Sequence, residues 1–441
     1  MISLPCLSEL PPRRFENPAT LRRLTTASRA LAELKGVAAT IPNQDILIST
    51  LGLQEAKDSS AIENIVTTHD ELFRDALFPA TLARSAAKEV LRYRQALRVG
   101  HELVSVHGLL LTSHLLRIQA ELELNNAGLR RLPGTTLKNS AGETVYTPPQ
   151  EHDQIVLLMA DLERFINDDG LFDADPLVKM ALIHYQFESI HPFYDGNGRT
   201  GRILNVLYLV RQGLLENPVL NLSRAIVRRK ADYYRLLQAV REGDAWEEWV
   251  DFMLAAVEES ATDAIATIGQ IKAALHDAKH RIRAGFRFYS QDLINNLFTH
   301  PYTKIDFLMR DLGVSRLTAT RYLDALSAEG FLEKQRVGRA NYYINRRLCD
   351  IIAGGEGKAS ARQCLAPVAL RAGSSSPMRM PGRQPSSAGS MPFQATTRYL
   401  SIGLFYRCGT PLQGKHLLVG YIHHDMLLGE SMNHLPKPHH E

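Results

Sequence analysis

A short polar segment between two helix-forming stretches carries residue types suited to phosphate chemistry. The glycines of its Gly-Asn-Gly sequence let backbone N–H groups approach an anion, and the helix that follows offers further N–H groups at its N-terminus. Arg199 and Arg202 supply fixed charge for phosphate oxygens, and Asp195 is a hard oxygen ligand for magnesium. His191 opens the segment, and an imidazole that titrates near neutrality suits a general base. The segment therefore predicts nucleotidyl or phosphoryl transfer.

Each of these features is common by itself, since a Gly-Asn-Gly sequence is usually only a turn and a histidine beside an apolar helix is usually a core residue. The complete run, however, matches every specified position of the signature HxFx[D/E]GNGRxxR. The segment therefore resembles the catalytic loop of the Fic family. The resemblance implies an all-α catalytic core with this loop between its two central helices. It also implies a protein adenylyltransferase, which moves AMP from ATP to a Ser, Thr or Tyr hydroxyl of a protein target.

The resemblance assigns roles along the loop. His191 would deprotonate the target hydroxyl, Asp195 would hold Mg²⁺ between the α- and β-phosphates, and Phe193 would anchor the loop in the core. The glycines and the asparagine would cradle the phosphates, and the two arginines would hold the end that leaves as pyrophosphate. The ATP-binding residues implied in this way are Gly196, Asn197, Gly198, Arg199, Thr200, Gly201 and Arg202.

A second pattern precedes the loop by more than a hundred residues. The run from Ser59 to Asn64 fits the inhibitory motif [S/T]xxxE[G/N] of the same family, and Ser59 and Glu63 are spaced to share one helix face. By itself this spacing is typical of a solvated face. Beside a complete catalytic loop it resembles the family's autoinhibitory helix, which implies that Glu63 pairs with Arg202 and withholds it from the γ-phosphate.

Residues 127–149 differ from the helical sequence around them. A turn-forming stretch, Asn139 to Gly142, lies between short β-prone stretches and predicts a hairpin over residues 134–147. The hairpin resembles the flap of Fic proteins, which implies that it clamps the target segment as an added strand. Strand addition uses backbone hydrogen bonds and therefore tolerates varied target sequences.

Apolar residues at helical spacing predict a mainly α fold around these motifs. Helices are expected from Thr20 to about His107, from Asp175 to about Ile190 with Pro176 in the first turn, directly after the loop, and over about residues 230–284. One further helix has a clear apolar stripe, formed by Ile155, Leu158, Met159, Leu162 and Phe165.

Residues 286–350 read as a separate unit. A short helix at 303–312, a turn at Gly313 and Ser315, a second helix and a hairpin around Gly338 follow in the order of a winged helix-turn-helix. Five of its side chains could meet phosphates and base edges: Arg316, Thr318, Arg321, Arg336 and Arg339. A DNA-binding regulator and a protein-interaction or dimer module both remain open, and either is compatible with catalysis.

The predicted organisation has four parts: residues 1–107 an N-terminal helical region with the inhibitory helix, 108–285 the catalytic core, 286–350 the winged helix-turn-helix, and 351–441 a low-complexity, disordered tail. A net charge of +4 permits a polyanionic partner without requiring one. The four cysteines are scattered, and neither a signal-peptide pattern nor a membrane-length apolar run is seen, so we expect a cytoplasmic protein with no membrane contact.

Several points are open at this stage. A Fic-like transferase or kinase that uses another nucleotide is the alternative within the same class, although Gly198 favours AMP transfer. The sequence departs from related ones at Arg228 to Lys230, before Tyr233 and Tyr234, so no adenine contacts are assigned. The target is not indicated, and self-modification and a homodimer both remain open.

Overall fold

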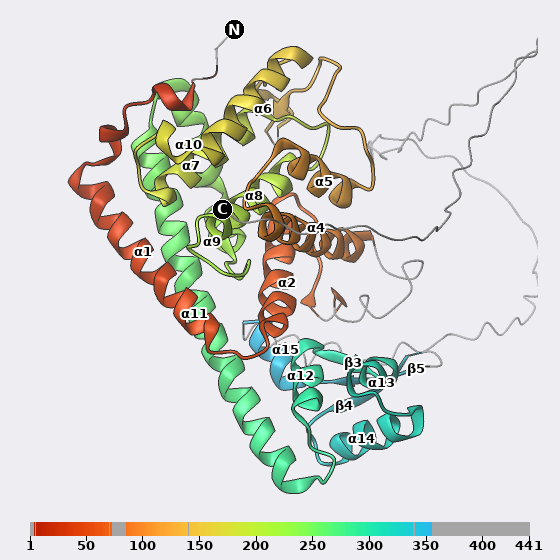
Figure 1. The fold of residues 1–441 in the computed structure, drawn as a ribbon. Coiled ribbons are helices and arrows are strands. Elements are labelled where there is room, and N and C mark those ends of the chain that lie inside the picture. The colour runs from red at the N-terminus through yellow and green to blue at the C-terminus, as the bar shows by residue number, and fades with distance from the viewer. Residues whose placement is uncertain are drawn as a thin grey trace, which may run out of the picture. The chain divides into compact units, whose positions relative to one another are not determined.

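The structure is a computed structural model, which describes residues 4, 6–69, 71–72, 85–139, 141–337 and 340–354. These residues are mostly helical (Figure 1). The helices up to the long α11 are α1 (Pro18–Ala39), α2 (Gln44–Ile62), α4 (Ser85–His107), α5 (Thr112–Glu123), α6 (His152–Asn167), α7 (Pro176–Ile190), α8 (Asn197–Arg211), α9 (Leu222–Arg228), α10 (Lys230–Gly243) and α11 (Trp246–Gly285). Three short 3₁₀ helices add to them: Leu7–Glu9, Pro12–Phe15 and Asp169–Leu171. The mainly α prediction is confirmed.

Helices α7 and α8 form the centre of the fold and pack against each other. Every residue of α7 from Leu177 onward is buried, as is expected of a helix that other elements cover on all sides. The predicted start is confirmed, because Pro176 is the first residue of α7 and the Asp175 side chain accepts a hydrogen bond from the Leu177 N–H at 2.8 Å. The catalytic loop joins these two central helices, as the resemblance implied.

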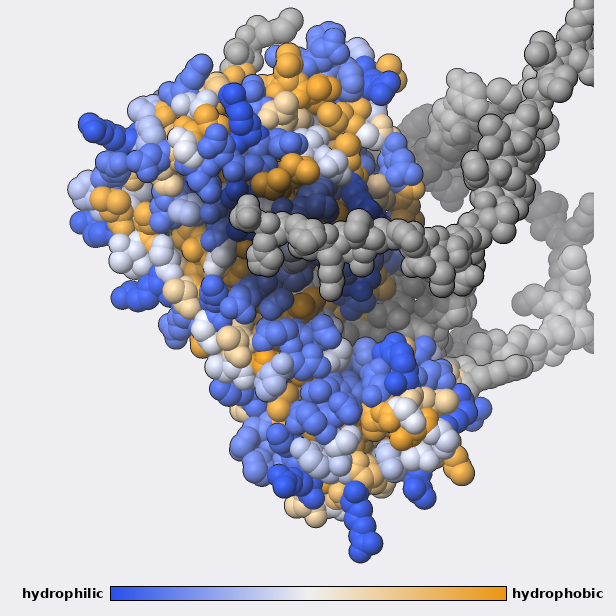
Figure 2. Space-filling view, in the orientation of Figure 1, coloured by the Kyte–Doolittle hydropathy of each residue, from blue (hydrophilic) through white to orange (hydrophobic). Residues whose placement is uncertain are grey.

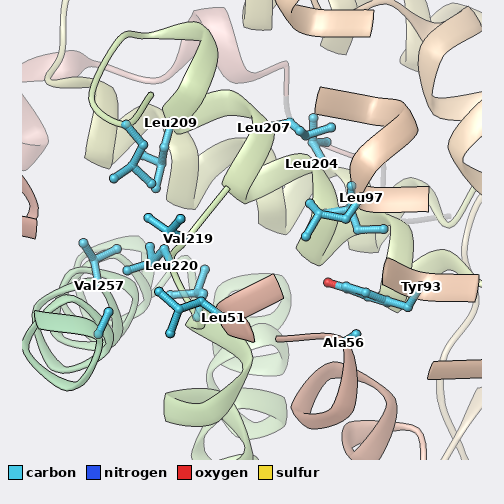
Figure 3. Packing of buried hydrophobic residues seen from close by; sticks show 14 of the residues in the cluster. Leu51, Ala56, Tyr93, Leu97, Leu204, Leu207, Leu209, Val219, Leu220 and Val257 are labelled. Atoms are coloured by element: carbon cyan, nitrogen blue, oxygen red, sulfur yellow. The ribbon is translucent and has the colours of Figure 1, made fainter. Parts of the chain in front are cut away.

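Helix α4 crosses α8 closely, and α1 runs along α11 (Figure 1). Leu97 of α4 lies beside Leu204 and Leu207 of α8 in the apolar core (Figure 3). Leu51 of α2 belongs to the same cluster of buried side chains, together with Val257 of α11 (Figure 3). The helix that carries the inhibitory motif is therefore packed into the core by its apolar residues, which fixes where its C-terminal end lies.

The predicted stripe on α6 agrees with the burial pattern. Ile155, Met159, Leu162 and Phe165 are buried, while Leu158 is only partly covered at the edge of the stripe. The predicted hairpin is also present, as β1 (Leu137–Lys138) and β2 (Thr144–Tyr146), which pair antiparallel with Leu137 opposite Tyr146.

The residues after α11 form a small helix and sheet unit with α12 (Gln291–Thr299), β3 (Tyr302–Lys304), α13 (Ile305–Leu312), α14 (Arg316–Ala328), β4 (Glu333–Val337), β5 (Ala340–Ile344) and α15 (Arg346–Ile352). The expected order of two helices and a hairpin is present, and Ser315 caps α14 by accepting the Thr318 N–H at 3.3 Å. The expected first helix was too long, because its first residues pair with β5 as strand β3. That pairing joins segments distant in sequence, so local periodicity does not indicate it.

Figure 2 shows a mostly hydrophilic face with apolar residues scattered over it. Among the described residues, no helix combines the length and the apolar character needed to cross a membrane. The predicted tail begins too early, because Ile351 and Ile352 belong to α15 and Ile352 is buried. The rest of the tail from residue 355, the Gly338 turn and Arg339 lie outside the described residues.

Candidate active site

The loop between α7 and α8 is held in shape by its own side chains. Asn197 closes it, because its Oδ1 accepts the Phe193 N–H at 2.8 Å and its Nδ2 donates to the Phe193 carbonyl at 2.8 Å. The Phe193 ring is fully buried, in agreement with the predicted anchor. Gly196 caps α8 with φ +79°, a conformation that favours glycine. The Asn197 side chain therefore shapes the cradle, and only its backbone remains available to an anion.

His191 lies at the C-terminal end of α7 in a left-handed backbone conformation with φ 50°. Its Nδ1 is buried and has no hydrogen-bond partner among the described residues. Burial, and then the charge of Arg130, lower the pKa of His191 to about 4, whereas the bare side chain predicted a value near neutrality. The low pKa keeps the imidazole neutral at physiological pH, which is the form that a general base requires.

Asp195 is the candidate magnesium ligand. Its side chain is 77% exposed and lies 4.0 Å from the Arg199 guanidinium, and its Oδ1 accepts the Gly196 N–H at 2.7 Å. Within the described part of the chain, no group of three or more His, Cys, Asp or Glu residues could hold a metal ion. Mg²⁺ is commonly bound by one or two carboxylates together with substrate phosphates, so a single exposed aspartate beside an anion cradle fits that ion.

Arg199 is almost fully buried and is surrounded by carboxylates. Its Nη2 lies 2.7 Å from Glu123 Oε1, and its Nη1 lies 3.7 Å from Glu89 Oε2. Glu123 also closes over the loop, because a Cβ added at Gly196 would lie 2.7 Å from its Oε1. Neither glutamate is indicated by the sequence, because both come from helices distant from the loop and belong to no motif.

Arg202 is held by the predicted inhibitory motif. Its Nε donates to Ser59 Oγ at 2.7 Å, and its Nη2 donates to the Ser59 carbonyl at 3.1 Å and to Glu63 Oε1 at 2.8 Å. The guanidinium side chain is 1% exposed. Burial is the largest single effect on the pKa of Glu63 and acts to raise it. The charge and hydrogen bond of Arg202, together with the charges of Arg199 and Lys230, lower that pKa overall. The ion pair that the resemblance implied is present.

The Glu63 carboxylate lies directly over Gly198 of the loop. A Cβ added at Gly198 would lie 2.4 Å from Glu63 Oε1, a distance at which one of the two would have to move. Asn64 follows with φ 63°, and Lys230 of α10 donates to its Oδ1 at 3.3 Å and to the Ile62 carbonyl at 2.6 Å. Lys230 therefore fixes the end of α2, and an anionic group already lies against the anion cradle.

Thr200 and Gly201 lie in the contact between the two central helices. Both are buried, and a Cβ at Gly201 would lie 2.6 Å from Glu188 Oε1 and 3.0 Å from the Phe187 ring. Glu188 is a buried carboxyl whose Oε1 has no hydrogen-bond partner in the described chain, and burial raises its pKa to about 7. The close approach of α7 and α8 accounts for glycine at 201, and ATP binding by these two residues stays a prediction.

The flap hairpin is attached to the catalytic loop at several points. Tyr146 donates through its hydroxyl to the Ser189 carbonyl at 2.9 Å, and the Arg241 guanidinium stacks 3.9 Å above its ring. The Tyr194 hydroxyl accepts hydrogen bonds from the backbone N–H groups of Arg131 at 2.8 Å and Leu132 at 3.1 Å.

The stretch at 228–230, which departs from related sequences, is held by ion pairs. Arg228 and Arg229 both pair with Glu259 of α11.

The fold and this loop define a class, the Fic-domain proteins. Residues 109–209 match the Fic/DOC family, residues 21–102 match the Fic/DOC family N-terminal region, and residues 275–348 match the C-terminal domain described as protein adenylyltransferase SoFic-like. Three separate parts of the chain therefore match the Fic/DOC core region, the N-terminal region of that family and the SoFic-like C-terminal domain.

Among curated proteins, protein adenylyltransferase fic-1 of Caenorhabditis briggsae is 34% identical over 96 residues, which are 22% of this chain and 18% of that protein. Protein adenylyltransferase Fic of Drosophila erecta is 36% identical over 99 residues, 22% of this chain and 19% of that protein. The matched region thus spans about a fifth of the length of these relatives.

Two solved structures match the chain at low sequence identity. A Fic family protein from Desulfovibrio desulfuricans G20 is 23% identical with a TM-score of 0.47, and the match covers 74% of this chain and 96% of that one. Fic-1 from C. elegans, residues 134–508, is 20% identical with a TM-score of 0.44, and the match covers 58% of this chain and 74% of that one.

Proposed function

We propose that the protein transfers AMP from ATP to a hydroxyl group of a protein target. The observation that carries this proposal is the complete loop between α7 and α8, with a neutral histidine at its entry and two glycines followed by a helix N-terminus. These features supply a base and an anion cradle at one site. The curated relatives named protein adenylyltransferase match this chain over about 22% of its length, which adds support.

The reaction is a displacement at the α-phosphorus. The target oxygen attacks that phosphorus and forms the new P–O bond, the bond to the bridging oxygen of the β-phosphate breaks, and pyrophosphate leaves. His191 accepts the proton of the attacking hydroxyl at Nε2. That nitrogen has a free lone pair when the neutral imidazole carries its own proton on Nδ1. The loop N–H groups and Arg202 balance charge on the phosphates. Bound at Asp195, Mg²⁺ would supply further charge neutralisation on the leaving group.

Glu63 is proposed to restrain this reaction. It lies on Gly198 and bonds to Arg202, so the triphosphate cannot use that arginine or that part of the cradle while the carboxylate is present. An exposed ion pair contributes only about 0.2–1 kcal/mol, whereas breaking a fully buried pair typically costs about 3–5 kcal/mol. This pair lies between the two cases, because Arg202 is 1% exposed and Glu63 is 35% exposed. A contact of this size is enough to hold the site in a restrained state.

The test compares AMP incorporation by the wild type, Glu63→Gly and Glu63→Gly with Arg202→Ala, using labelled ATP and mass spectrometry of the products. Glu63→Gly is expected to incorporate AMP into itself or added protein at least tenfold faster than the wild type. Arg202→Ala is expected to cancel that gain, because both changes act on one interaction. Equal rates for the wild type and Glu63→Gly would overturn the restraint, and an adduct with the mass of phosphate alone would overturn AMP transfer.

Partners and location stay at the level of proposal. We propose a protein target with an accessible hydroxyl, which includes the protein itself, and a cytoplasmic site of action where ATP is supplied. DNA binding by the C-terminal unit stays a prediction; Arg316 of α14 already forms an ion pair with Asp306 at 3.0 Å. Retention on a DNA column that falls steeply with salt would support it. A homodimer also stays a prediction, which the mass in solution would test.

A further inference from the structure

Arg130 is a fully buried arginine whose charge is not matched by a carboxylate. Its side chain is 0% exposed, and it takes part in none of the ion pairs found in the described chain. Two of its nitrogens donate to main-chain carbonyls instead: Nε to His191 at 2.8 Å, and Nη2 to Ile190 at 3.3 Å and to Pro149. The buried Nη1 has no hydrogen-bond partner among the described residues. Burying a charge without an opposite charge is costly, so a residue of this kind needs a reason to be an arginine.

Arg130 holds the peptide group of the candidate base. His191 adopts φ 50°, a strained conformation for a residue with a side chain, and strained positions of this kind persist only when surrounding contacts hold them. The His191 N–H donates to the Phe187 carbonyl at 3.0 Å, and its carbonyl accepts the Arg130 Nε–H. The next residue is held as well, since the Arg130 N–H donates to the Pro192 carbonyl at 2.9 Å. Both sides of the strained residue are therefore fixed.

Arg130 also joins the two ends of the flap segment. It precedes β1, and Pro149, whose carbonyl it binds, follows β2. Tyr146 of β2 bonds to the Ser189 carbonyl, one residue before the stretch that Arg130 binds. A shift of the flap on target binding would thus be transmitted to the turn that carries His191, because one planar guanidinium bonds to both.

We propose that Arg130 is the positioning residue of the catalytic loop: its guanidinium holds His191 in its strained conformation and couples the base of the flap to it. This inference rests on the proposed AMP transfer, but one of its tests, the titration of His191, does not require that activity. Arg130 acts through His191 and is not expected to touch ATP. Its role therefore predicts a loss in kcat with little change in the KM for ATP.

The charge of Arg130 gives a readout that does not depend on activity. After burial, Arg130 is the main cause of the low pKa of His191, with Arg241 acting in the same direction and Glu63 against it. Removing the guanidinium charge should therefore move the His191 titration upward from about 4. A residue that only filled space would not have this effect on the imidazole.

The experiment uses the full chain with Arg130→Met and Arg130→Lys, and Arg131→Met as the matched control. Arg131 is the exposed neighbour, so its replacement removes the same charge one residue away. Histidine NMR, assigned by the signal that His191→Ala removes, follows the pKa of His191. AMP incorporation gives kcat and the KM for ATP, and circular dichroism checks folding.

Arg130→Met is expected to raise the pKa of His191 and to lower kcat about 10²-fold, since small errors in attack geometry cost factors of this size. Arg130→Lys is expected to keep the low pKa but not the rate, because an ammonium keeps the charge and loses the planar fork. Arg131→Met should behave as the wild type in both measurements.

A kcat for Arg130→Met within twofold of Arg131→Met would overturn the inference, and so would a change confined to the KM for ATP. Unfolding of both Arg130 variants would also overturn it, because the residue would then serve overall stability. If neither the wild type nor Glu63→Gly transfers AMP, the proposed function fails, while the His191 titration still decides whether Arg130 acts on that imidazole.

Discussion

At the scale of single residues, the side chains of the loop are defined by what surrounds them. His191 is neutral because it is buried beside Arg130, and the two arginines are each held by a glutamate, Glu123 for Arg199 and Glu63 for Arg202. The loop thus carries the positive charge that the sequence predicted, but both arginines are already paired with glutamates. A phosphate could bind to either arginine only if the corresponding ion pair broke.

The base can be tested by its removal. His191→Ala is expected to lower AMP incorporation by about 10²–10⁴-fold, the usual contribution of a general base, while ATP binding stays within about threefold of the wild type. ATP affinity should persist because the cradle consists of backbone groups and arginines. Calorimetry of ATP binding and mass spectrometry of the AMP adduct provide the two measurements. His101→Ala, a change at a partly exposed position of α4, serves as the control. A variant at His191 with near-normal transfer would show that another group takes the proton.

At the scale of elements, the site depends on helices that approach one another closely. Gly201 lets α8 lie against Phe187 and Glu188 of α7, and Gly100 lets α4 lie against Leu207 of α8. Close packing of this kind leaves little space for added atoms, so glycines inside these helices are set by tertiary contacts. This is the reason that they occur where helix propensity alone would disfavour them.

Two glycines inside helices allow the effect of close packing on stability to be tested, because one is tightly packed and the other is open. A Cβ at Gly100 would lie 2.5 Å from Leu207 Cδ1 and 2.9 Å from Ile118 Cδ1, both in fully buried side chains. Gly100→Ala should destabilise the protein by about 1–3 kcal/mol through overpacking. Gly269 of α11 has nothing within 4 Å of an added Cβ, so Gly269→Ala should stabilise by about 0.5–1 kcal/mol. The midpoints of unfolding in urea provide the measurement, and equal midpoints for both variants would contradict the packing argument.

At the scale of the whole molecule, the C-terminal unit touches α2, the helix that ends at Glu63. Gln54 of α2 donates to the carbonyl of Ile352 in α15, and α12 also packs against α2 (Figure 1). The described chain is first interrupted at residue 70, seven residues after Glu63, but α2 itself is packed into the core along its length. A unit without any residue of the catalytic loop therefore supports the position of Glu63.

Truncation tests this support. A chain that ends after Ala284 lacks α12 and α15, so α2 loses part of its packing while the loop and both central helices are retained. We expect the truncated protein to keep AMP transfer to itself and to do so a few-fold faster than the full chain. The rate of AMP incorporation and the helical circular dichroism signal provide the measurements. Loss of activity in a truncation that remains folded would mean that the C-terminal unit shapes the site directly.

Buried histidines predict how stability varies with pH. Burial lowers the pKa of His69 to about 3, of His184 to about 3 and of His191 to about 4. A histidine in the unfolded chain has a pKa of about 6.5. At pH values between about 6.5 and the lower pKa of the folded state, the unfolded chain binds protons that the folded chain does not, so stability falls as the pH falls. Glu188 has the opposite effect on stability. Its pKa is raised to about 7 in the folded chain, so between pH 7 and its lower pKa in the unfolded chain the folded chain holds the extra proton.

The thermal midpoint at pH 7, 6 and 5 measures the balance. The three histidines should outweigh Glu188, so the midpoint should fall toward pH 5. His184→Gln should make the fall shallower, and Glu188→Gln should make it steeper, because each removes one titrating group of opposite effect. An unchanged pH slope in both variants would show that these groups titrate alike in the folded and unfolded chain.

The sequence by itself indicated most of the helices and the residue types of the loop. Apolar spacing predicted α6 and α7, Pro176 marked the start of α7, and the run from His191 to Arg202 identified the catalytic loop, because these signals lie within a few turns of chain. The pairing of Glu63 with Arg202 came from the resemblance to Fic proteins, since the two are 139 positions apart and no spacing rule joins them. Tertiary structure decided the rest: Glu123 against Arg199, the low pKa of His191, and the grip of Arg130 on the loop. Each is a contact between buried side chains or carbonyls of segments that only packing brings together, and a bare sequence carries no signal for desolvation or for such distant neighbours.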